Sequence, residues 1–443
     1  MKRRRIAIVG AGFSGAALAA NLLKRGQAAP DVVLIERRQR FGPGLAYGGS
    51  DPGHLLNVRA SNLGAFADKP EHFARWIGGD PTRFMPRTRF GKYIEQVLRR
   101  ASSGWFGPRL TRVRDSVIAC RRNGERWVLA LGSGKSIEAE AVVIATGNPP
   151  PTAPTIFEQN GVPLIDPWDS VALARLPPGD VLLLGAGLTM VDVAVSLGRR
   201  RRKGLIFALS RRGLAPRGHL SSPAPATPAA LDLPIPLSEA LHEFRRDQRE
   251  RVKRGEPWQF SIDRLRARSP ELWQRLPLDA QLRFLRHLRV WWDVHRHRAA
   301  PEAASRVAEL QAAGRLKVLA GEISSVEQEG RVFHLQHRQR GSFVRHKFDV
   351  VGIVNCTGAA LDPWLSVDPF VRQLLDEGVA RAHPNGLGFD VDPDGRVLSA
   401  EGAIQDNLFA IGPITQGAFW ESTAVPEIRV RAAAIAMMLA PEA

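Results

Sequence analysis

Two glycine-rich turns, 175 residues apart, constrain the fold more than any other feature of this sequence. Each turn follows an apolar run and opens a second apolar stretch with the character of a helix. Glycines at such a turn let the backbone approach a pyrophosphate, which binds at the helix N-terminus. The first turn contains Gly10, Gly12 and Gly15, and the second contains Gly185 and Gly187. The pair predicts two nucleotide-binding βαβ units, with electron transfer between the two nucleotides.

The residue after the next strand predicts which nucleotide the first unit binds. Twenty-six positions after Gly10, the apolar run 31–35 leads to Glu36. A carboxylate at this place accepts the two ribose hydroxyls and repels a 2′-phosphate. The first unit is therefore predicted to bind FAD.

The same spacing in the second unit leads to a different residue type. Twenty-six positions after Gly185, the run 204–210 is followed by Arg211 and then Arg212. Guanidinium groups hold a 2′-phosphate bidentately, so the second unit fits NADPH, with NADH still open. Met190 stands where a third glycine usually lets the helix pack closely on the strand. A Rossmann-like unit that binds no ligand is the alternative.

Length and composition are those of a globular protein. The 443 residues suggest roughly three domains of about 150 residues, with 44% apolar and 24% charged residues. No apolar run reaches the ~18 residues that a membrane span needs. Basic residues at 2–5 before an apolar stretch imitate a secretory signal. The glycine spacing and Glu36 explain the same residues, so we expect neither export nor a membrane partner.

The net charge of +18 suggests nucleic-acid binding. Only nine of the 62 basic residues are Lys, and the Arg residues are spread along the chain, with short runs at 2–5 and 199–203. Aromatic residues do not alternate with them as base stacking requires. Nucleic acid is therefore not an expected partner.

Cysteine usage argues against one kind of flavin chemistry. The chain has two cysteines, Cys120 and Cys356, and no C-x-x-C pair. Dithiol exchange beside a flavin is therefore not expected, and the low count fits a cytoplasmic protein. Cys356 ends the apolar run 350–355, which predicts one buried strand with the cysteine as a small core residue.

The order of the segments predicts an α/β protein with two dinucleotide-binding (Rossmann-like) domains and an inserted helical subdomain. Each unit ends a strand with Thr-Gly, at Thr146-Gly147 and at Thr357-Gly358, which argues for two related halves. The predicted domains are a first FAD-binding part, an NAD(P)-binding domain that carries the insertion, and a return to the FAD-binding domain. Their limits are 1–160, 161–356 with the insertion at about 213–315, and 357–443.

The insertion opens with a Pro-rich linker at 221–236 and continues as helices. Residues 237–254 are strongly charged, and residues 278–298 are apolar at helical spacing. A helical insertion near a nucleotide site suits a lid over a substrate and suits a dimer surface equally well. Three prolines are predicted to start helices: Pro270, Pro277 and Pro301.

Five segments, 10–15, 44–48, 54–58, 292–298 and 412–427, carry a resemblance that spans nearly the whole chain. They resemble the bacterial FAD/NAD(P)-binding oxidoreductases grouped with flavin-dependent urate hydroxylase and aspartate N-hydroxylase. The resemblance implies a fold for two dinucleotides, FAD as cofactor and often monooxygenation, and it leaves the substrate open.

One pair of residues departs from the wider flavoprotein pattern. Gly412 is followed by Pro413 where Asp is usual, so the contact of that Asp with the flavin ribityl chain is in doubt. The resemblance places His54 and Asn57 in a loop near the flavin, although a capped turn after Asp51 explains them as well. The helix expected from Thr423 could direct its N-terminal dipole at the reduced flavin.

The insertion and the segment after Gly412 supply the remaining candidates for catalysis. His295 and Arg298, three residues apart, are predicted to share a helix face and to contact substrate or an anion. A metal site is not expected, because no carboxylate or thiolate ligand stands near them in the pattern. Trp420 is expected to pack, and Glu421 could serve as a base.

Together these features predict an FAD-dependent NAD(P)H oxidoreductase. The leading hypothesis is a monooxygenase that uses oxygen, through a flavin peroxide, to hydroxylate a small nitrogen-containing or heterocyclic molecule. A reductase or oxidase that inserts no oxygen uses the same cofactors and is the second hypothesis. The third, based on charge alone, is the flavin-binding module of an RNA-modifying system. A homodimer is compatible with all three.

Overall fold

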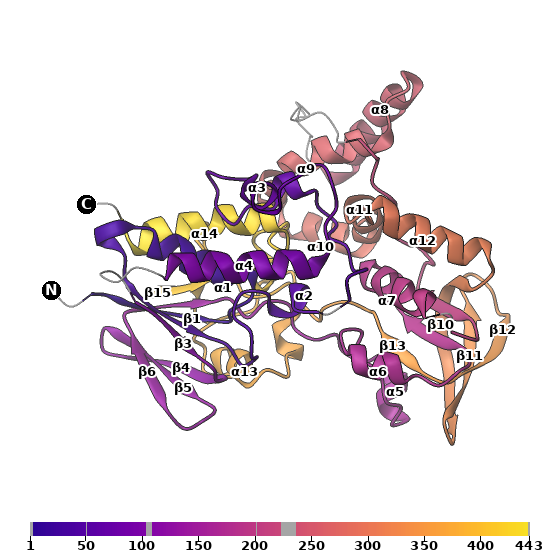
Figure 1. The fold of residues 1–443 in the computed structure, drawn as a ribbon, viewed down its shortest axis with the longest axis horizontal. Helices are drawn as coiled ribbons and strands as arrows, with labels where there is room; N and C mark the ends of the chain where they lie inside the picture. Colours follow the sequence, from indigo (N-terminus) through magenta and orange to yellow (C-terminus); the bar gives the residue numbers. More distant parts are fainter. Residues whose placement is uncertain (1–2, 50, 103–108, 201, 223–235, 442–443) are drawn as a thin grey trace.

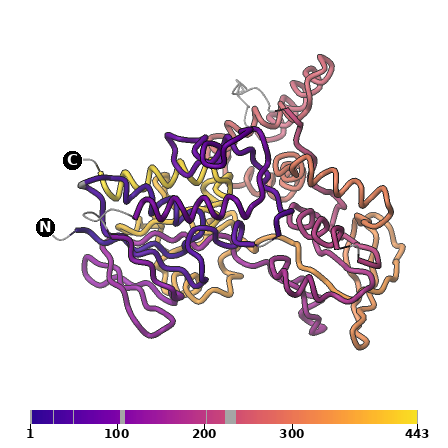
Figure 2. The backbone as a smooth tube through the Cα atoms, viewed as in Figure 1, coloured from indigo at the N-terminus to yellow at the C-terminus, as the bar shows by residue number. Residues whose placement is uncertain are grey.

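The computed structural model describes residues 3–49, 51–102, 109–200, 202–222 and 236–441. They form two lobes, each built around a six-stranded sheet (Figure 1). The chain builds most of the first lobe, crosses to the second, and returns to the first near its C-terminal end (Figure 2). The predicted α/β class, with two Rossmann-like units, is confirmed.

The first sheet runs in the order β14-β15-β7-β1-β2-β3, and all neighbours are parallel except β14 and β15. Its central strands are continuous apolar runs because both faces of the sheet are covered. The strands are β1 (Arg5–Val9), β2 (Asp31–Ile35), β3 (Leu110–Val113), β7 (Ala141–Ile144), β14 (Arg396–Leu398) and β15 (Ile404–Ala410).

Helices cover one face of this sheet and a small antiparallel sheet with one helix covers the other. The helices of the first face are α1 (Phe13–Leu23), α4 (Arg87–Ala101) and α14 (Val425–Leu439). The other face is covered by β4 (Val117–Asn123), β5 (Arg126–Leu131), β6 (Ser136–Ala139) and α13 (Pro369–Asp376). Short elements fill the connections: η1 (Gly26–Ala28), α2 (Gly44–Tyr47), η2 (Ala60–Asn62), α3 (His72–Ile77), η3 (Pro363–Leu365) and η4 (Pro413–Thr415).

The second sheet runs in the order β12-β11-β10-β9-β8-β13. Its strands β13, β8, β9 and β10 are parallel, and β10 continues into an antiparallel meander with β11 and β12. The strands are β8 (Val181–Leu184), β9 (Ile206–Ser210), β10 (Leu316–Glu329), β11 (Val332–Gln339), β12 (Arg345–Val350) and β13 (Ile353–Asn355). The helices around it are α5 (Thr155–Gln159), α6 (Ser170–Arg175), α7 (Leu188–Arg199) and α12 (Pro301–Ala312).

The predicted domain limits near 160 and 356 fall in segments that connect the two sheets. Helix α5 lies before the first limit, yet its fully buried Phe157 packs in the core of the second lobe. One predicted strand is wrong, because the run 350–356 is divided between β12 and β13. These strands lie at opposite edges of the second sheet, so the chain crosses the sheet at Val351-Gly352 instead of continuing one strand.

In its described residues the insertion contributes four further helices, α8 (Leu237–Lys253), α9 (Trp258–Arg275), α10 (Leu278–His287) and α11 (Arg289–Arg296). The apolar stretch 278–298 is therefore two helices, divided at Leu288. Pro301 does start α12, and Pro277 immediately precedes α10. The part of the predicted linker at 223–235 lies outside the described residues.

Pro270 does not start a helix but lies inside α9, which corrects the prediction. A proline has no N–H for the carbonyl four residues earlier, and that carbonyl belongs to Arg266. The Ser269 hydroxyl donates to the Arg266 oxygen instead, over 2.9 Å. This local replacement explains why the helix continues through the proline.

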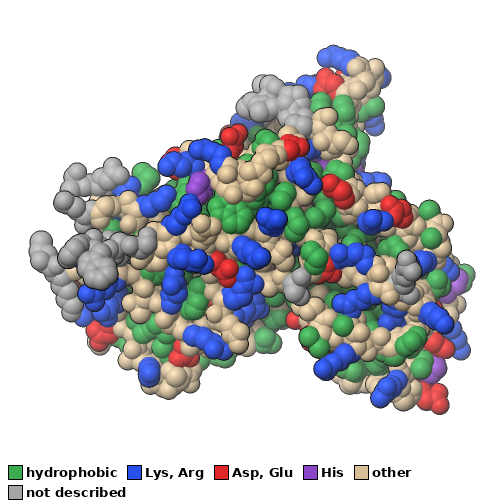
Figure 3. Space-filling model, in the orientation of Figure 1, with side chains coloured by type: hydrophobic (Ala, Val, Ile, Leu, Met, Phe, Trp, Pro, Cys, Tyr) green, Lys and Arg blue, Asp and Glu red, His purple; other side chains and the backbone are tan. Residues whose placement is uncertain are grey.

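The surface matches the charge pattern of the sequence. Lys and Arg side chains are spread over both lobes of the face in Figure 3, with acidic side chains between them. Among the described residues, no helix has the length and apolar character needed to cross a membrane.

Candidate functional site

The first glycine turn leaves room for a ligand at the start of α1. A Cβ at Gly10 or Gly15 would collide with backbone of the turn or of the β7 end, so these glycines pack the turn tightly. A Cβ at Gly12 would meet only Gly44 Cα, at 3.6 Å. Gly12 is also the N-cap of α1, and no described side chain caps the helix. The first-turn N–H groups are therefore available to an anion.

Glu36 lies beside this turn, directly after β2. Its buried carboxylate accepts hydrogen bonds from Ala11 N, at 2.9 Å, and from Arg38 N, at 3.0 Å. The two bonds fix the carboxylate next to the N-terminus of α1, where an adenosine ribose is expected.

The second turn has the same construction. Gly185 has φ +100°, and a Cβ there would collide with the Cys356 carbonyl. A Cβ at Gly187 would meet nothing within 4 Å, and Gly187 caps α7 with no side chain in support. Met190 is fully buried in the core of the lobe. It replaces the third glycine without displacing the helix start, which follows the first glycine by three residues in both units.

Arg211 follows β9 as Glu36 follows β2. Its side chain is exposed, and its carbonyl accepts a hydrogen bond from Arg340 Nη1 at 3.2 Å. The Arg212 guanidinium lies 5.9 Å from the centre of the Trp291 ring on α11. Several cations therefore gather where the second unit would present a 2′-phosphate site.

The Thr-Gly strand ends close both units. Gly147, after Thr146, has φ +78°, and Gly358 has φ +92°. The Thr357 hydroxyl donates to Asn355 Oδ1 at 2.6 Å, which holds the end of β13 in place. Both turns lie at the carboxyl ends of parallel strands, where open α/β sheets bind ligands.

Gly412 brings the C-terminal segment to the first turn. It has φ +85°, and a Cβ there would lie 2.5 Å from Ser14 Oγ on α1. Pro413 starts η4 in place of the usual Asp. Helix α14 begins at Val425 with Ala424 as N-cap, so Thr423 precedes the helix and does not start it. Because no described side chain caps α14, its first N–H groups and the positive end of its dipole are open.

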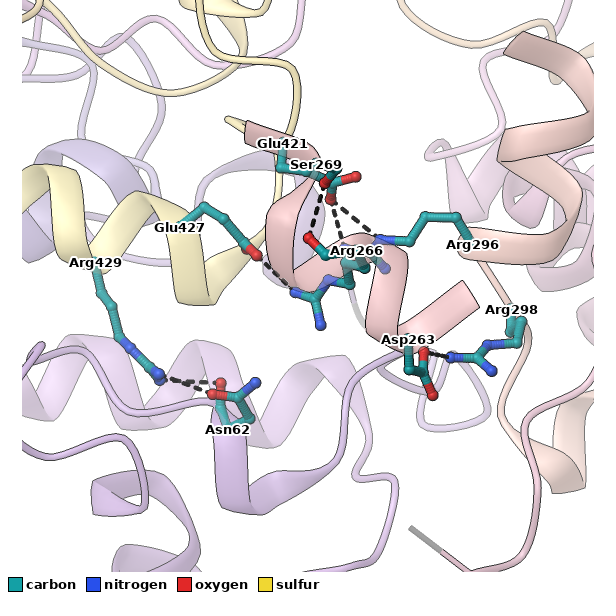
Figure 4. A network of polar contacts seen from close by, with 9 residues as sticks. All are labelled: Asn62, Asp263, Arg266, Ser269, Arg296, Arg298, Glu421, Glu427 and Arg429. Atoms are coloured by element: carbon teal, nitrogen blue, oxygen red, sulfur yellow. Dashed lines mark hydrogen bonds and ion pairs between the residues drawn. The ribbon is translucent and has the colours of Figure 1, made fainter. Parts of the chain in front are cut away.

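A buried polar cluster joins the insertion to the segment around the start of α14 (Figure 4). Glu421 Oε2 accepts from Arg296 Nη2 at 2.6 Å and from Nε at 3.1 Å, with 3% and 5% of the two side chains exposed. Arg266 donates to Glu427 at 2.8 Å. Arg429 Nη2 donates to Asn62 Oδ1, also at 2.8 Å.

This cluster is not saturated by protein partners. Five of its buried atoms have no hydrogen-bond partner among the described residues: Glu421 Oε1, Ser422 Oγ, Glu427 Oε2, Arg266 Nε and Arg429 Nε. Buried polar atoms are almost always paired, so their concentration at one place indicates a site completed by a ligand or ordered water. These atoms, the room at Gly12 and the placement of Glu36 fit a flavin dinucleotide in the first lobe.

The ion pair determines the charge of Glu421. Burial raises the pKa of this carboxyl, but Arg296, His297 and Arg266 outweigh the burial, so the pKa lies below its ordinary value. A general base works best with a pKa near the working pH. The geometry therefore favours a positioning role for Glu421, and its role as a base stays a prediction.

His54 and Asn57 lie where the two lobes meet. His54 Nε2 is 2.8 Å from Ser196 Oγ on α7, and Ser196 also bonds Asp51. The Asn57 carbonyl accepts from His219 Nε2 at 3.0 Å. Burial and the nearby Arg298 lower the pKa of His219 to about 3, so its ring is neutral and donates this bond. Contact of His54 or Asn57 with a flavin stays a prediction.

His295 and Arg298 do not share a helix face, because α11 ends at Arg296. They approach one aromatic ring instead. The His295 ring meets Trp258 edge-on at 5.0 Å, and the Arg298 guanidinium lies 6.0 Å from the centre of the same ring. Arg298 also forms an ion pair with Asp263. The helices of the insertion surround a cavity, and of His295 and Arg298 only His295 lines it.

The sequence interpretation missed Arg266, Arg296 and Glu427. Arg296 lies between the two residues chosen for catalysis, and only its position on α11 shows that it turns toward Glu421. A second missed pair, Arg87 and Asp192, joins α4 to α7 across the two lobes at 2.8 Å.

Residues 7–149 match the profile of the family described as FAD-NAD(P)-binding. The matched segment contains the first glycine turn and Glu36. No curated protein matches the sequence.

Solved structures match the chain along its whole length. The reduced form of ornithine hydroxylase from Pseudomonas aeruginosa is 14% identical, with 100% of both chains covered and a TM-score of 0.66. Ornithine N-hydroxylase from Kutzneria sp. 744, solved with reduced FAD, NADP⁺ and L-ornithine, is 15% identical, with 99% of both covered and a TM-score of 0.64. L-lysine 6-monooxygenase from Pseudomonas syringae is 18% identical, with 99% of both covered and a TM-score of 0.63. At these identities the likeness establishes the shared two-dinucleotide fold.

Proposed function

We propose that this chain is an FAD-dependent NAD(P)H monooxygenase that hydroxylates a small nitrogen-containing or heterocyclic molecule. The observation that carries the proposal is the pair of uncapped helix starts, each with open space at its second glycine. Glu36 beside the first and Arg211 after the second suit FAD and NADPH respectively. The finer grouping with urate and aspartate hydroxylases remains part of this proposal.

The fold neighbours support the choice of reaction. Their names describe hydroxylation of ornithine and lysine, which are small amines, and one was solved with the two cofactors proposed here. Fold alone does not decide function. The buried polar cluster around the start of α14 adds a site on this chain where such chemistry could be enclosed.

The residues of this chain have distinct tasks in the proposal. When bound, FAD would supply hydride acceptance from NAD(P)H and activation of oxygen. Glu36 would hold the adenosine ribose, and the N–H groups at α1 the pyrophosphate. The positive end of the α14 dipole, at the uncapped start of the helix, would stabilise negative charge on the reduced flavin. The ion pair of Arg296 with Glu421 ties the insertion to the first lobe.

Oxygen consumption tests the reaction class. Protein loaded with FAD should oxidise NADPH and consume oxygen, and the true substrate should raise the yield of hydroxylated product over hydrogen peroxide. Labelled oxygen gas should place one labelled atom in the product, as mass spectrometry would detect. Peroxide as the only product across a broad panel of amines and heterocycles would favour a reductase or oxidase instead.

The coenzyme preference should depend on Arg211. Replacing Arg211 by Ala removes a charge-assisted contact with the 2′-phosphate, which costs roughly 1.5–3 kcal/mol, about ten- to a hundredfold in affinity. We expect KM for NADPH to rise by that factor while KM for NADH changes little. Arg331→Ala, in the exposed turn between β10 and β11, removes the same charge and should leave both constants unchanged. Equal effects on both coenzymes would refute the assignment.

A further inference from the structure

A cavity of about 620 Å³ lies inside the helical insertion. Helices α8, α9, α10 and α11 surround it, and Trp420, from the segment before α14, forms part of its wall. Its volume is within the range of about 300–1,000 Å³ that is usual for small-molecule sites. No residue of either glycine turn lines it. Trp291 in its wall lies 5.9 Å from the Arg212 guanidinium, so the cavity borders the proposed 2′-phosphate site.

The wall of this cavity is aromatic. Five tryptophans and two phenylalanines line it. The rings of Trp273 and Trp420 stack at 4.7 Å, and Phe284 meets Trp420 edge-on at 5.3 Å. Flat aromatic walls bind a planar ring through offset stacking and edge contacts, beyond the apolar area that is buried. A flexible aliphatic chain would gain only the free energy of burying its apolar surface.

The charged side chains that line the cavity are all arginines. Arg217, Arg245 and Arg275 contribute to its lining, and no Asp or Glu of the described residues does. Arg217 and Arg245 are exposed, and neither forms an ion pair with a described carboxylate. A guanidinium binds a carboxylate or another oxyanion in a planar, bidentate way. An ammonium group could contact the tryptophan faces, but it would find no carboxylate partner in the lining and would be repelled by the three guanidiniums.

We propose that the cavity is the substrate site and that it takes a planar aromatic ring carrying an anionic group, not an aliphatic diamine. That the bound molecule is a substrate rests on the proposed monooxygenase function. The preference for an aromatic anion rests on the cavity lining alone. The preference sets the chain apart from its fold neighbours, whose names describe ornithine and lysine as substrates. Arg245 and Arg217 at the rim would hold the anion while the tryptophans hold the ring.

A series of probes that share the indole ring system and differ in charge tests the preference. Titration calorimetry on the FAD-loaded protein would compare indole-3-acetate, indole-3-acetamide and tryptamine, with cadaverine as the aliphatic dication. The anion should bind at least about tenfold more tightly than the neutral amide, because one charge-assisted contact is gained. Tryptamine should bind more weakly than the amide, and cadaverine should not bind measurably.

Two variants on α8, each with a matched control, locate the binding. Arg245→Gln should remove most of the preference for the acetate over the amide and leave the affinity for the amide unchanged. Arg246→Gln changes the net charge equally, but Arg246 faces Glu243 outside the cavity and should keep the preference. Leu241→Trp fills cavity space and should weaken all indoles, whereas Val252→Trp, exposed on the same helix, should not.

The results separate this inference from the proposed function. Tightest binding of tryptamine or cadaverine would overturn the assigned class, and so would an unchanged acetate preference in Arg245→Gln. Absence of binding by every probe would overturn the site. Oxygen consumption with NADPH is measured independently: selective binding of the acetate in a protein that consumes no oxygen would keep the cavity's preference and refute the monooxygenase.

Discussion

Gly12→Val should yield a colourless protein, and Gly187→Val a yellow one that NADPH no longer reduces efficiently. In both turns the second glycine borders open space, while its flanking glycine is locked against the backbone of a strand end. A branched side chain would therefore occupy the path of a pyrophosphate without colliding with the protein backbone at its Cβ. The measurements are the flavin absorbance of the purified protein and the rate of flavin reduction by NADPH.

Two controls make the pair decisive. Gly12→Ala adds a Cβ at an ordinary contact distance of 3.6 Å from Gly44 Cα, so the fold should accept it and any loss of FAD reports on the ligand. Circular dichroism of each variant checks the fold. Full FAD occupancy in Gly12→Val, or loss of FAD in Gly187→Val, would contradict the assignment of one nucleotide to each lobe.

The features predicted correctly from the sequence depend on neighbours along the chain. In each unit the strand, the glycine turn and the helix are consecutive, at 5–23 and 181–199, and the spacing to Glu36 and Arg211 follows from one βαβ geometry. The α/β class follows in turn. One local prediction was wrong because a side chain replaces a backbone hydrogen bond. Pro270 lies inside α9 and does not start a helix, because the Ser269 hydroxyl supplies the hydrogen bond that the proline cannot.

The features that were missed depend on residues far apart in sequence. Glu421 and Arg296 are separated by 125 positions, and His54 and Ser196 by 142. Helical spacing suggested that His295 and Arg298 act together, but it cannot show that α11 ends between them. The aromatic cavity is likewise formed by residues of four helices together with Arg217 and Trp420 from two separate loops, and no pattern along the sequence shows that these segments meet.

Loss of the Arg296 side chain should destabilise the protein more than loss of any exposed arginine. In Arg296→Met, the Glu421 carboxylate would remain buried without its partner, and uncompensated buried charges cost about 3–5 kcal/mol. Arg283→Met is the control, because Arg283 and its partner Asp279, 3.0 Å away, are 60% and 73% exposed. Exposed pairs contribute about 0–1 kcal/mol. Urea denaturation followed by tryptophan fluorescence would compare the two.

The pH dependence identifies the cause of the loss. In the wild type the pKa of Glu421 lies below its ordinary 4.5, so the ion pair stabilises the fold above that pH and the contribution disappears as the pH falls through the lowered pKa. Without Arg296, burial would instead raise this pKa, so the carboxyl would protonate in the folded state. The deficit of Arg296→Met should therefore be largest at neutral pH and shrink as the solution is acidified. The double variant Arg296→Met, Glu421→Leu should recover much of the stability, because neither charge of the pair remains buried without its partner. A deficit that is independent of pH and persists in the double variant would mean that Arg296 acts through packing, and not through its charge.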